Sequence, residues 1–172
     1  MVETEAERAE HGQPVSHRPW LLPAWLLLGL ARLAVRIVPF RRLAAALGGG
    51  RDDAPWVPLL APDQERTALR LGRAIRSASR YTPWSSNCFA QALSARLLLG
   101  LHRVPCTVFF GVSRDRASAR MIAHAWVAAG RIRVTGGDGF AHHVVVGSFA
   151  SGPAAAAIRP SSPPIPASDD PA

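Results

Sequence analysis

Apolar residues are densest between positions 20 and 47, and their pattern there predicts helix. The richest part, residues 21–30, has the composition of a membrane span. Arg32 and Arg36 interrupt it before it reaches the roughly twenty apolar residues that spanning needs. Pro39 then breaks the pattern. The run is therefore predicted to be too short to cross a membrane.

Three interpretations of this N-terminal segment stay open. It can be an interfacial helix that makes a peripheral contact with a membrane, with Trp20 and Trp25 at the level of the headgroups. Alternatively, it is a pair of helices that pack on the core or on a partner protein. A true membrane span is a third alternative.

A linker rich in glycine and proline is predicted over residues 48–62, followed by an amphipathic helix from Asp63 to about Arg80. Asp63 is a suitable N-cap residue for this helix. Its apolar face is formed by Ala68, Leu71, Ile75 and Ala78, and its arginine face by Arg66, Arg70, Arg73 and Arg80. The arginine row is most simply a solvated face, with a binding role as the alternative.

A further helix is predicted from about Asn87 to Leu99, with Gly100 as the residue that ends it. Very few of its positions are polar, so it is expected to be buried as the central helix of the domain. Strands are predicted over residues 104–113, 122–129, 132–134 and 143–149. Because helices precede an antiparallel sheet along the chain, the pattern predicts an α+β fold.

Composition divides the chain into four segments. Residues 1–19 are polar, and residues 151–172 contain six prolines, so both ends are predicted to be disordered tails. Residues 20–62 form the apolar helical region and the linker, and residues 63–150 form the core. About 130 residues then remain between the tails, enough for a modest hydrophobic core.

Charge is strongly asymmetric, since the net charge is +8 and every basic residue is an arginine. Without lysine, the chain has no side-chain amine for Schiff-base chemistry. A basic face favours a negatively charged partner: an acidic peptide, an anionic lipid or a nucleic acid. The chain lacks zinc-ligand spacing and any recognisable nucleic-acid-binding motif, so nucleic acid is not expected as a partner. We also expect neither a cofactor nor a metal ion.

The two cysteines, Cys88 and Cys106, do not make a disulfide framework in a chain of this length. The apolar stretch near the start lacks the flanks and cleavage site of a signal peptide. The sequence thus predicts a cytoplasmic protein with reduced thiols, in which membrane association remains open.

Candidate chemistry lies in Cys88 and His124. Residues 85–87 are all cap-forming, so Cys88 is expected in the first turn of its helix, where unpaired N–H groups and the helix dipole favour a thiolate. His124 is expected on an alternating strand, on the same face as Trp126. It would be the base that forms an ion pair with the thiolate and later protonates a leaving amine. Each residue alone is more simply a packed side chain, but the pair favours catalysis. Cys106 lies in an apolar strand without an adjacent base and is interpreted as structural.

A third residue usually orients the imidazole in such sites. The only acidic residues of the region from position 66 to position 150 are Asp115 and Asp138. Asp115 lies in a polar turn, where solvent would weaken its effect. Asp138 follows the strand after His124, which an antiparallel pairing can bring back beside the imidazole. Asp138 is therefore the favoured third residue, although its glycine-rich surroundings also fit an ordinary turn.

The motifs resemble a known family when they are taken together and in order. They are Asn87-Cys88 followed by Gly100, Val104-Pro105-Cys106 leading to Phe110-Gly111-Val112, and Ala123-His124-Ala125-Trp126-Val127, with Val38-Pro39-Phe40-Arg41-Arg42 and Val134-Thr135-Gly136-Gly137 as further matches. They resemble the transglutaminase-like leader peptidases of lasso-peptide biosynthesis, often called the B protein. The resemblance covers about 115 residues, from near Leu30 to Phe149.

This resemblance implies a transglutaminase-like or papain-like cysteine protease core that cuts one peptide bond of a ribosomally made precursor. It gives Cys88 the role of nucleophile, His124 that of base and Asp138 that of the orienting acid. Some members carry the acid closer to the histidine, at a position that falls within residues 135–137 here. The site is therefore either a triad with Asp138 or a dyad.

The resemblance also implies partners. Its larger members carry an N-terminal module that binds the leader, whereas the first 80 residues here show no run of strands to build one. The chain would then be the split form, which acts with a separate leader-recognition protein and precedes an ATP-using lasso cyclase. Two alternatives stay open: a transglutaminase-like acyltransferase that uses the same dyad, and a non-catalytic, membrane-associated scaffold.

Overall fold

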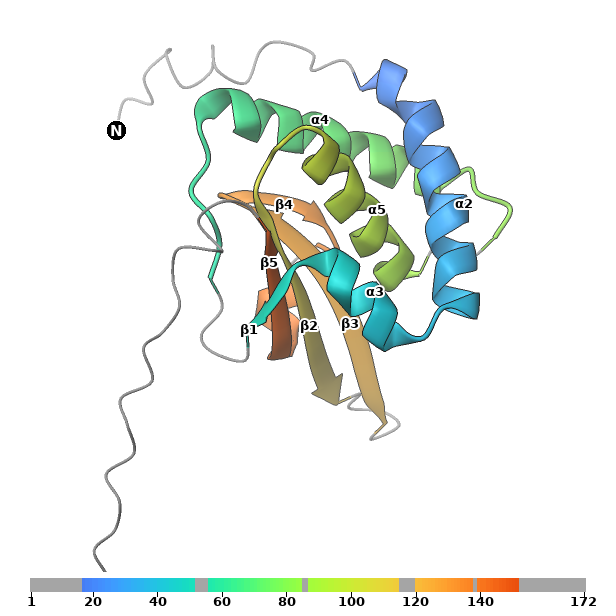
Figure 1. The fold of residues 1–172 in the computed structure, drawn as a ribbon, viewed down its shortest axis with the longest axis vertical. Helices are drawn as coiled ribbons and strands as arrows, with labels where there is room; N and C mark the ends of the chain where they lie inside the picture. Colours follow the sequence, from blue (N-terminus) through green and yellow to red (C-terminus); the bar gives the residue numbers. More distant parts are fainter. Residues whose placement is uncertain (1–16, 52–55, 85–86, 115–119, 138, 152–172) are drawn as a thin grey trace, which may run out of the picture.

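A layer of helices packs against a five-stranded antiparallel sheet in this chain (Figure 1). The computed structural model describes residues 17–51, 56–84, 87–114, 120–137 and 139–151. The predicted α+β fold, with a central helix on an antiparallel sheet and an N-terminal helical region, is confirmed. Most of the two predicted tails, positions 1–16 and 152–172, lies outside the described residues. Arg18–Trp20 forms a short 3-10 helix (η1), and Ser151 is the last residue of the last strand.

The apolar N-terminal region forms two helices, α2 (Leu21–Ile37) and α3 (Phe40–Leu47), on either side of Pro39. One side of α2 packs against α4 (Pro62–Ser79) and α5 (Cys88–Leu101). The helix continues through both of its arginines. By length and composition alone, residues 18–37 could cross a membrane, so the prediction that the run is too short was wrong.

Helix α4 begins two residues earlier than predicted. Its first residue is Pro62, which suits this position because its missing N–H would have no partner within the helix. Ala61 is the N-cap, and its N–H donates to the side-chain oxygen of Gln64 at 3.1 Å. Asp63 lies in the first turn instead of capping it. The predicted apolar face is buried, as expected.

Helix α5 begins as predicted and ends later. The side chain of Asn87, its N-cap, accepts a hydrogen bond from the N–H of Ala90 at 3.0 Å. Gly100 lies inside the helix, which ends at Leu101, so the prediction that Gly100 terminates it was wrong. The chain reverses at Arg103, which has a φ of 53°.

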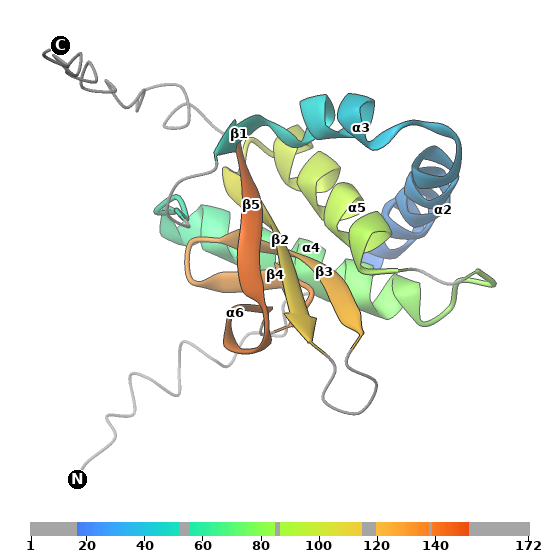
Figure 2. The same cartoon turned by 90° about the horizontal axis from the view of Figure 1, so that it is seen from below.

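The sheet has the order β1-β5-β2-β3-β4, and β2 lies at its centre (Figure 2). Its strands are β1 (Gly49–Arg51), β2 (Cys106–Arg114), β3 (Met121–Ala129), β4 (Ile132–Thr135) and β5 (Val144–Ser151). Four of these match the predicted strands to within about two residues. The sequence missed β1 because its three residues, Gly-Gly-Arg, carry no apolar alternation; they pair with the end of β5. A short helix, α6 (Gly139–His142), was also missed.

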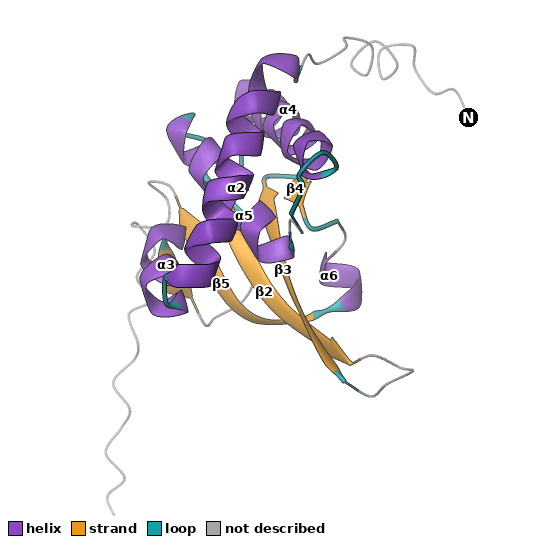
Figure 3. Ribbon diagram, turned by 90° about the vertical axis from the view of Figure 1, so that its right-hand side faces the viewer, coloured by secondary structure: helices purple, strands orange, loops and turns teal. Residues whose placement is uncertain are grey.

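The two faces of the sheet have different coverings (Figure 3). Val108 of β2 and Val127 of β3 belong to the large hydrophobic core, which the helices cover. Phe109 and Trp126, one residue along in each strand, belong to a small cluster on the opposite face, the face on which α6 lies. Partly buried Val57 packs on that cluster. The site described below lies beside the first turn of α5.

Candidate active site

Cys88 is the first residue of α5, and its side chain is half-buried. The sequence places it there because Asn87 caps the helix immediately before it. The first N–H groups of a helix have no partner within it, and the helix dipole makes this end positive. The thiol therefore lies where an anion, either a thiolate or a reacting oxyanion, is stabilised.

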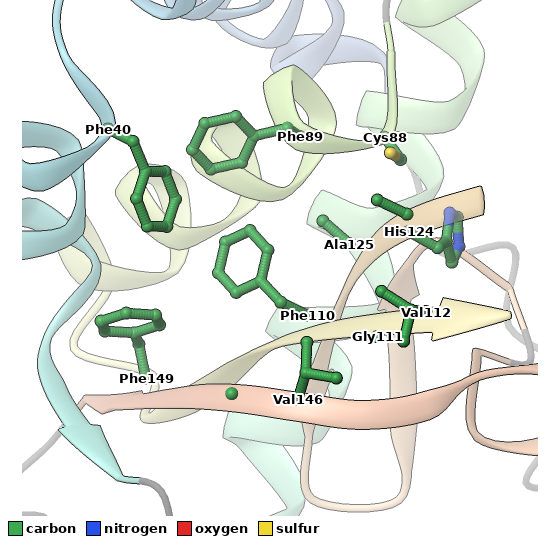
Figure 4. A pocket seen from close by; sticks show the side chains of 12 residues that line it. Phe40, Cys88, Phe89, Phe110, Gly111, Val112, His124, Ala125, Val146 and Phe149 are labelled. Atoms are coloured by element: carbon green, nitrogen blue, oxygen red, sulfur yellow. The ribbon is translucent and has the colours of Figure 1, made fainter. Parts of the chain in front are cut away.

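A cavity of about 540 Å³ opens beside Cys88, and His124 also lines it (Figure 4). The two predicted reactive residues thus share one cavity. Both residues are described in full, and no hydrogen bond joins Sγ of Cys88 to the imidazole. Catalytic contacts are often longer before substrate binds, so this geometry is compatible with a pair that tightens in the complex.

Four phenylalanines form one part of the cavity wall. Phe40, Phe89, Phe110 and Phe149 come from α3, α5, β2 and β5, and neighbouring rings lie 5.5 to 5.7 Å apart, mostly edge to face. Four elements that are distant in sequence therefore build one apolar surface next to the thiol. Such a surface accepts an apolar side chain or the aliphatic part of a peptide.

His124 lies on β3 opposite Gly111 of β2. Its Nε2 lies 2.8 Å from the carbonyl oxygen of Gly136, in the turn after β4. A carbonyl oxygen only accepts hydrogen bonds, so Nε2 must carry the proton. In the neutral ring Nδ1 then has the free lone pair and can take a proton from a thiol. The backbone of this turn thus fixes the tautomer that a general base needs.

The imidazole is also held by ring contacts. It stacks on Trp126, two residues along β3, with ring centroids 5.9 Å apart and an angle of 20° between the planes. This contact is expected, because the alternation of the strand places His124 and Trp126 on the same face. It also stacks on His143, at 4.8 Å and 27°. Two ring contacts and one hydrogen bond therefore define the orientation of His124.

Three glycines make room for the Trp126 ring. A Cβ at Gly111, Gly136 or Gly139 would lie 2.3 to 2.7 Å from atoms of Trp126. Gly136 has a φ of +80°, which side chains disfavour. The glycine-rich segment after β4 is therefore needed to bring its backbone against Trp126 and, through the Gly136 carbonyl, against His124.

His143 is a neighbour of His124 that the sequence did not indicate. His142 ends the short helix α6, and the next residue, His143, is half-buried against His124. Nδ1 of His143 is buried and has no hydrogen-bond partner among the described residues. Nothing in the sequence marked His143, because its contact with His124 arises from the pairing of β5 with β2.

The model of the Transglutaminase-like superfamily matches residues 25–146, more than half of the chain. The chain belongs to the transglutaminase-like superfamily. Enzymes of this superfamily often depend on a cysteine, which agrees with a thiol at a helix start and a strand histidine in one cavity. No curated protein and no solved structure matches the chain significantly.

The third residue of this transglutaminase-like site stays a prediction. Asp138 lies outside the described residues, as does Asp115. Gly136, two positions before Asp138, supplies the carbonyl that holds Nε2 of His124. The sequence analysis considered only acidic side chains as the orienting group. It did not find the backbone carbonyl of Gly136, because the identity of a residue does not show where its backbone lies.

Cys106 is a packed residue of the same domain. It is fully buried on β2, and its Sγ lies 3.3 Å from Oγ of Ser151. Burial raises the pKa of the Cys106 thiol, with the Ser151 hydrogen bond opposing that shift. A neutral, enclosed thiol agrees with the structural role inferred from the sequence.

Among the described residues, no group of three or more His, Cys, Asp or Glu side chains could hold a metal ion.

Proposed function

We propose that this chain is a cysteine peptidase that removes the leader peptide from a ribosomally synthesised lasso-peptide precursor. The observation that carries the proposal is that Cys88, at the capped start of α5, and His124, oriented by the Gly136 carbonyl, line the same cavity. The choice of substrate rests on the resemblance of the motifs around these residues to the B protein family.

The residues support the following acylation step. Nδ1 of His124 takes the thiol proton, and Sγ of Cys88 attacks the carbonyl carbon of the scissile bond. The carbonyl oxygen becomes an oxyanion that N–H groups at the start of α5 can stabilise. The imidazolium then gives its proton to the nitrogen of the breaking C–N bond. The core peptide leaves with a free amine, and the leader stays on Cys88 as a thioester.

Deacylation uses the same groups. His124 takes a proton from water, whose oxygen attacks the thioester carbon. The C–S bond breaks, the sulfur regains a proton from the imidazolium, and the leader leaves with a new carboxylate. The cycle needs no cofactor. Asp138 is proposed as the acid that helps to stabilise the imidazolium.

The aromatic wall gives the proposed enzyme a subsite. Phe40, Phe89, Phe110 and Phe149 offer apolar surface next to Cys88, so an apolar residue of the precursor near the scissile bond would bind there. We further propose that the leader is presented by a separate recognition protein in the cytoplasm. The released amine is then used by an ATP-dependent lasso cyclase to close the macrolactam.

Cleavage of the cognate precursor, followed by mass spectrometry in the presence of the recognition protein, tests this function. The wild-type chain is expected to make one cut that releases the leader, and Cys88→Ala and His124→Ala are each expected to reduce the rate by at least about 10³-fold. Cys106→Ala is the matched control and should retain cleavage. An uncut precursor with a folded wild-type chain contradicts the proposal, and transfer of the acyl group to an added amine in preference to water favours an acyltransferase.

A further inference from the structure

Helix α2 carries a line of exposed, large apolar side chains along its whole length. They are Leu22, Leu26, Leu30, Leu33 and Ile37, each between 54 and 69 % exposed. Their spacing of three or four residues places them on one side of the helix. We call these five residues the α2 stripe. At 1.5 Å per residue it is about 22 Å long.

The other side of α2 is also apolar, and it is buried against the domain. Ala24, Leu28 and Ala31 are buried where the helix packs on α4 and α5. A surface helix of a soluble domain normally presents polar residues outward, whereas α2 is apolar on both sides. Figures 1 and 2 both place α2 at the outer edge of the helical layer, so the α2 stripe faces away from the domain. Packing of the domain therefore does not explain the stripe.

The charges around the stripe are all of one sign. From position 17 to position 51 the sequence contains arginines and no acidic residue. Arg18 and Arg36 of this region are exposed near the two ends of α2, and Arg41 and Arg42 are exposed in the first turn of α3. A second copy docked through the same stripe would bring these arginines together, and like charges oppose such a contact. The partner that binds the stripe must instead combine an apolar interior with a negatively charged surface.

We propose that the α2 stripe docks on an anionic lipid bilayer. In this arrangement α2 lies in the plane of the membrane, with the stripe at the boundary between headgroups and acyl chains and the arginines beside lipid phosphates. The stripe lies on a protruding helix at the edge of the domain, which a flat bilayer accommodates. Because the opposite side of α2 is packed on α4 and α5, the folded domain rests on the membrane and α2 does not cross it.

Sedimentation of the full chain with lipid vesicles tests this proposal. Vesicles of phosphatidylcholine that contain about one third phosphatidylglycerol are expected to bind the chain at least tenfold more tightly than vesicles of phosphatidylcholine alone. Leu26→Gln/Leu30→Gln/Leu33→Gln, which changes only exposed side chains of the stripe, should reduce binding at least tenfold. Circular dichroism and the thermal midpoint would establish that this variant remains folded.

Two matched controls distinguish binding through the stripe from non-specific binding to vesicles. Leu59→Gln/Met121→Gln/Val144→Gln removes three apolar side chains away from α2 that are even more exposed, and this variant should bind vesicles like the wild type. Arg36→Gln/Arg41→Gln should weaken binding to the anionic vesicles by roughly fivefold for each arginine, an effect that added salt should imitate. Arg66→Gln/Arg70→Gln removes the same charge from α4 and should weaken it less.

Three outcomes overturn the proposal. The full chain does not bind anionic vesicles, or the stripe variant binds them as tightly as the wild type. In the third outcome, the wild type is a dimer that does not bind vesicles and the stripe variant is a monomer. The stripe would then be the contact surface between two copies of the chain. None of these measurements uses catalysis, so they are independent of the proposed peptidase activity.

Discussion

The imidazole of His124 is held by the backbone of Gly136, whose carbonyl oxygen lies 2.8 Å from Nε2. This contact joins β3 to the turn after β4, and it decides which ring nitrogen can accept a proton. It depends on a glycine with a φ of +80°, at which an added Cβ would clash with Trp126. The reactivity of His124 is therefore expected to depend on a residue that has no side chain.

Gly136→Ala tests that dependence. An added Cβ would lie 2.4 Å from Cβ of Trp126, and the positive φ adds strain of about 1–2 kcal/mol, so the turn must move and its carbonyl with it. We expect kcat for precursor cleavage to fall at least tenfold with a smaller change in KM. Gly137→Ala is the control, since it has a φ of +61° but nothing within 4 Å of the added Cβ. Equal losses of kcat in both variants would contradict the role of the carbonyl.

The two thiols should differ in reactivity. Cys88 is half-buried in the first turn of α5, whereas Cys106 is fully buried and burial raises the pKa of its thiol. At pH 6 the folded chain is expected to be alkylated by iodoacetamide on Cys88 at least tenfold faster than on Cys106, as followed by peptide mass spectrometry. His124→Ala should slow the reaction of Cys88. Similar rates at the two cysteines would favour the scaffold alternative.

Stability should decline at alkaline pH because of Cys106. The folded-state pKa of its thiol is raised above its ordinary value of 9.0, so above that pH the unfolded chain releases a proton that the folded chain retains. The free energy of unfolding should then decrease with rising pH between 9.0 and the folded-state pKa, by up to about 1.4 kcal/mol per pH unit from this group. Urea denaturation of the wild type and of Cys106→Ala at pH 7 and pH 10 measures it. A variant with the same alkaline loss as the wild type would show that other groups cause the decline.

The contact between α4 and β4 should support the site from a distance. Gly72 lets α4 approach β4, since an added Cβ would lie 2.8 Å from the carbonyl oxygen of Val134, and Nη1 of Arg76 donates to the same oxygen at 2.7 Å. Gly72→Ala is expected to lower the free energy of unfolding by about 1–3 kcal/mol. It should also lower kcat, because β4 leads directly to Gly136.

Gly100→Ala is the matched control for that experiment. Its added Cβ would meet only the end of the flexible Arg96 side chain, at 2.7 Å. Alanine also has a helix propensity about 1 kcal/mol better than glycine. Thermal unfolding of the two variants should therefore show a clear loss for Gly72→Ala and little loss for Gly100→Ala. The reverse order would contradict the close packing of α4 on β4.

Local patterns in the sequence were sufficient for the start of the cysteine helix and for the face of the histidine strand. Asn87 is a capping residue immediately before a helical run, so its role needed no tertiary information. The alternation of β3 likewise placed His124 on the same side as Trp126, where the two rings stack. The α+β class followed from the order of these elements.

Contacts made by backbone, or by residues brought together by the sheet, could not be predicted in the same way. The hydrogen bond to the Gly136 carbonyl is made by the backbone, which the identity of the residue does not reveal. His143 contacts His124 only because β5 pairs with β2. Strand β1 contains two glycines and an arginine, and it forms because the edge of β5 offers hydrogen bonds. The apolar run of α2 was predicted to be too short to cross a membrane because the count of apolar residues stopped at Arg32 and Arg36, whose long side chains can carry their charges to solvent.

Trapping the covalent intermediate tests the central claim most directly. The wild-type chain, mixed with the precursor and the recognition protein, would be quenched with acid within one turnover and its intact mass measured. We expect a species heavier by the mass of the leader acyl group, mapped to Cys88 by peptide analysis, retained in Cys106→Ala and lost in Cys88→Ala. Cleavage by Cys88→Ala at the wild-type rate, or an adduct on another residue, would contradict the account.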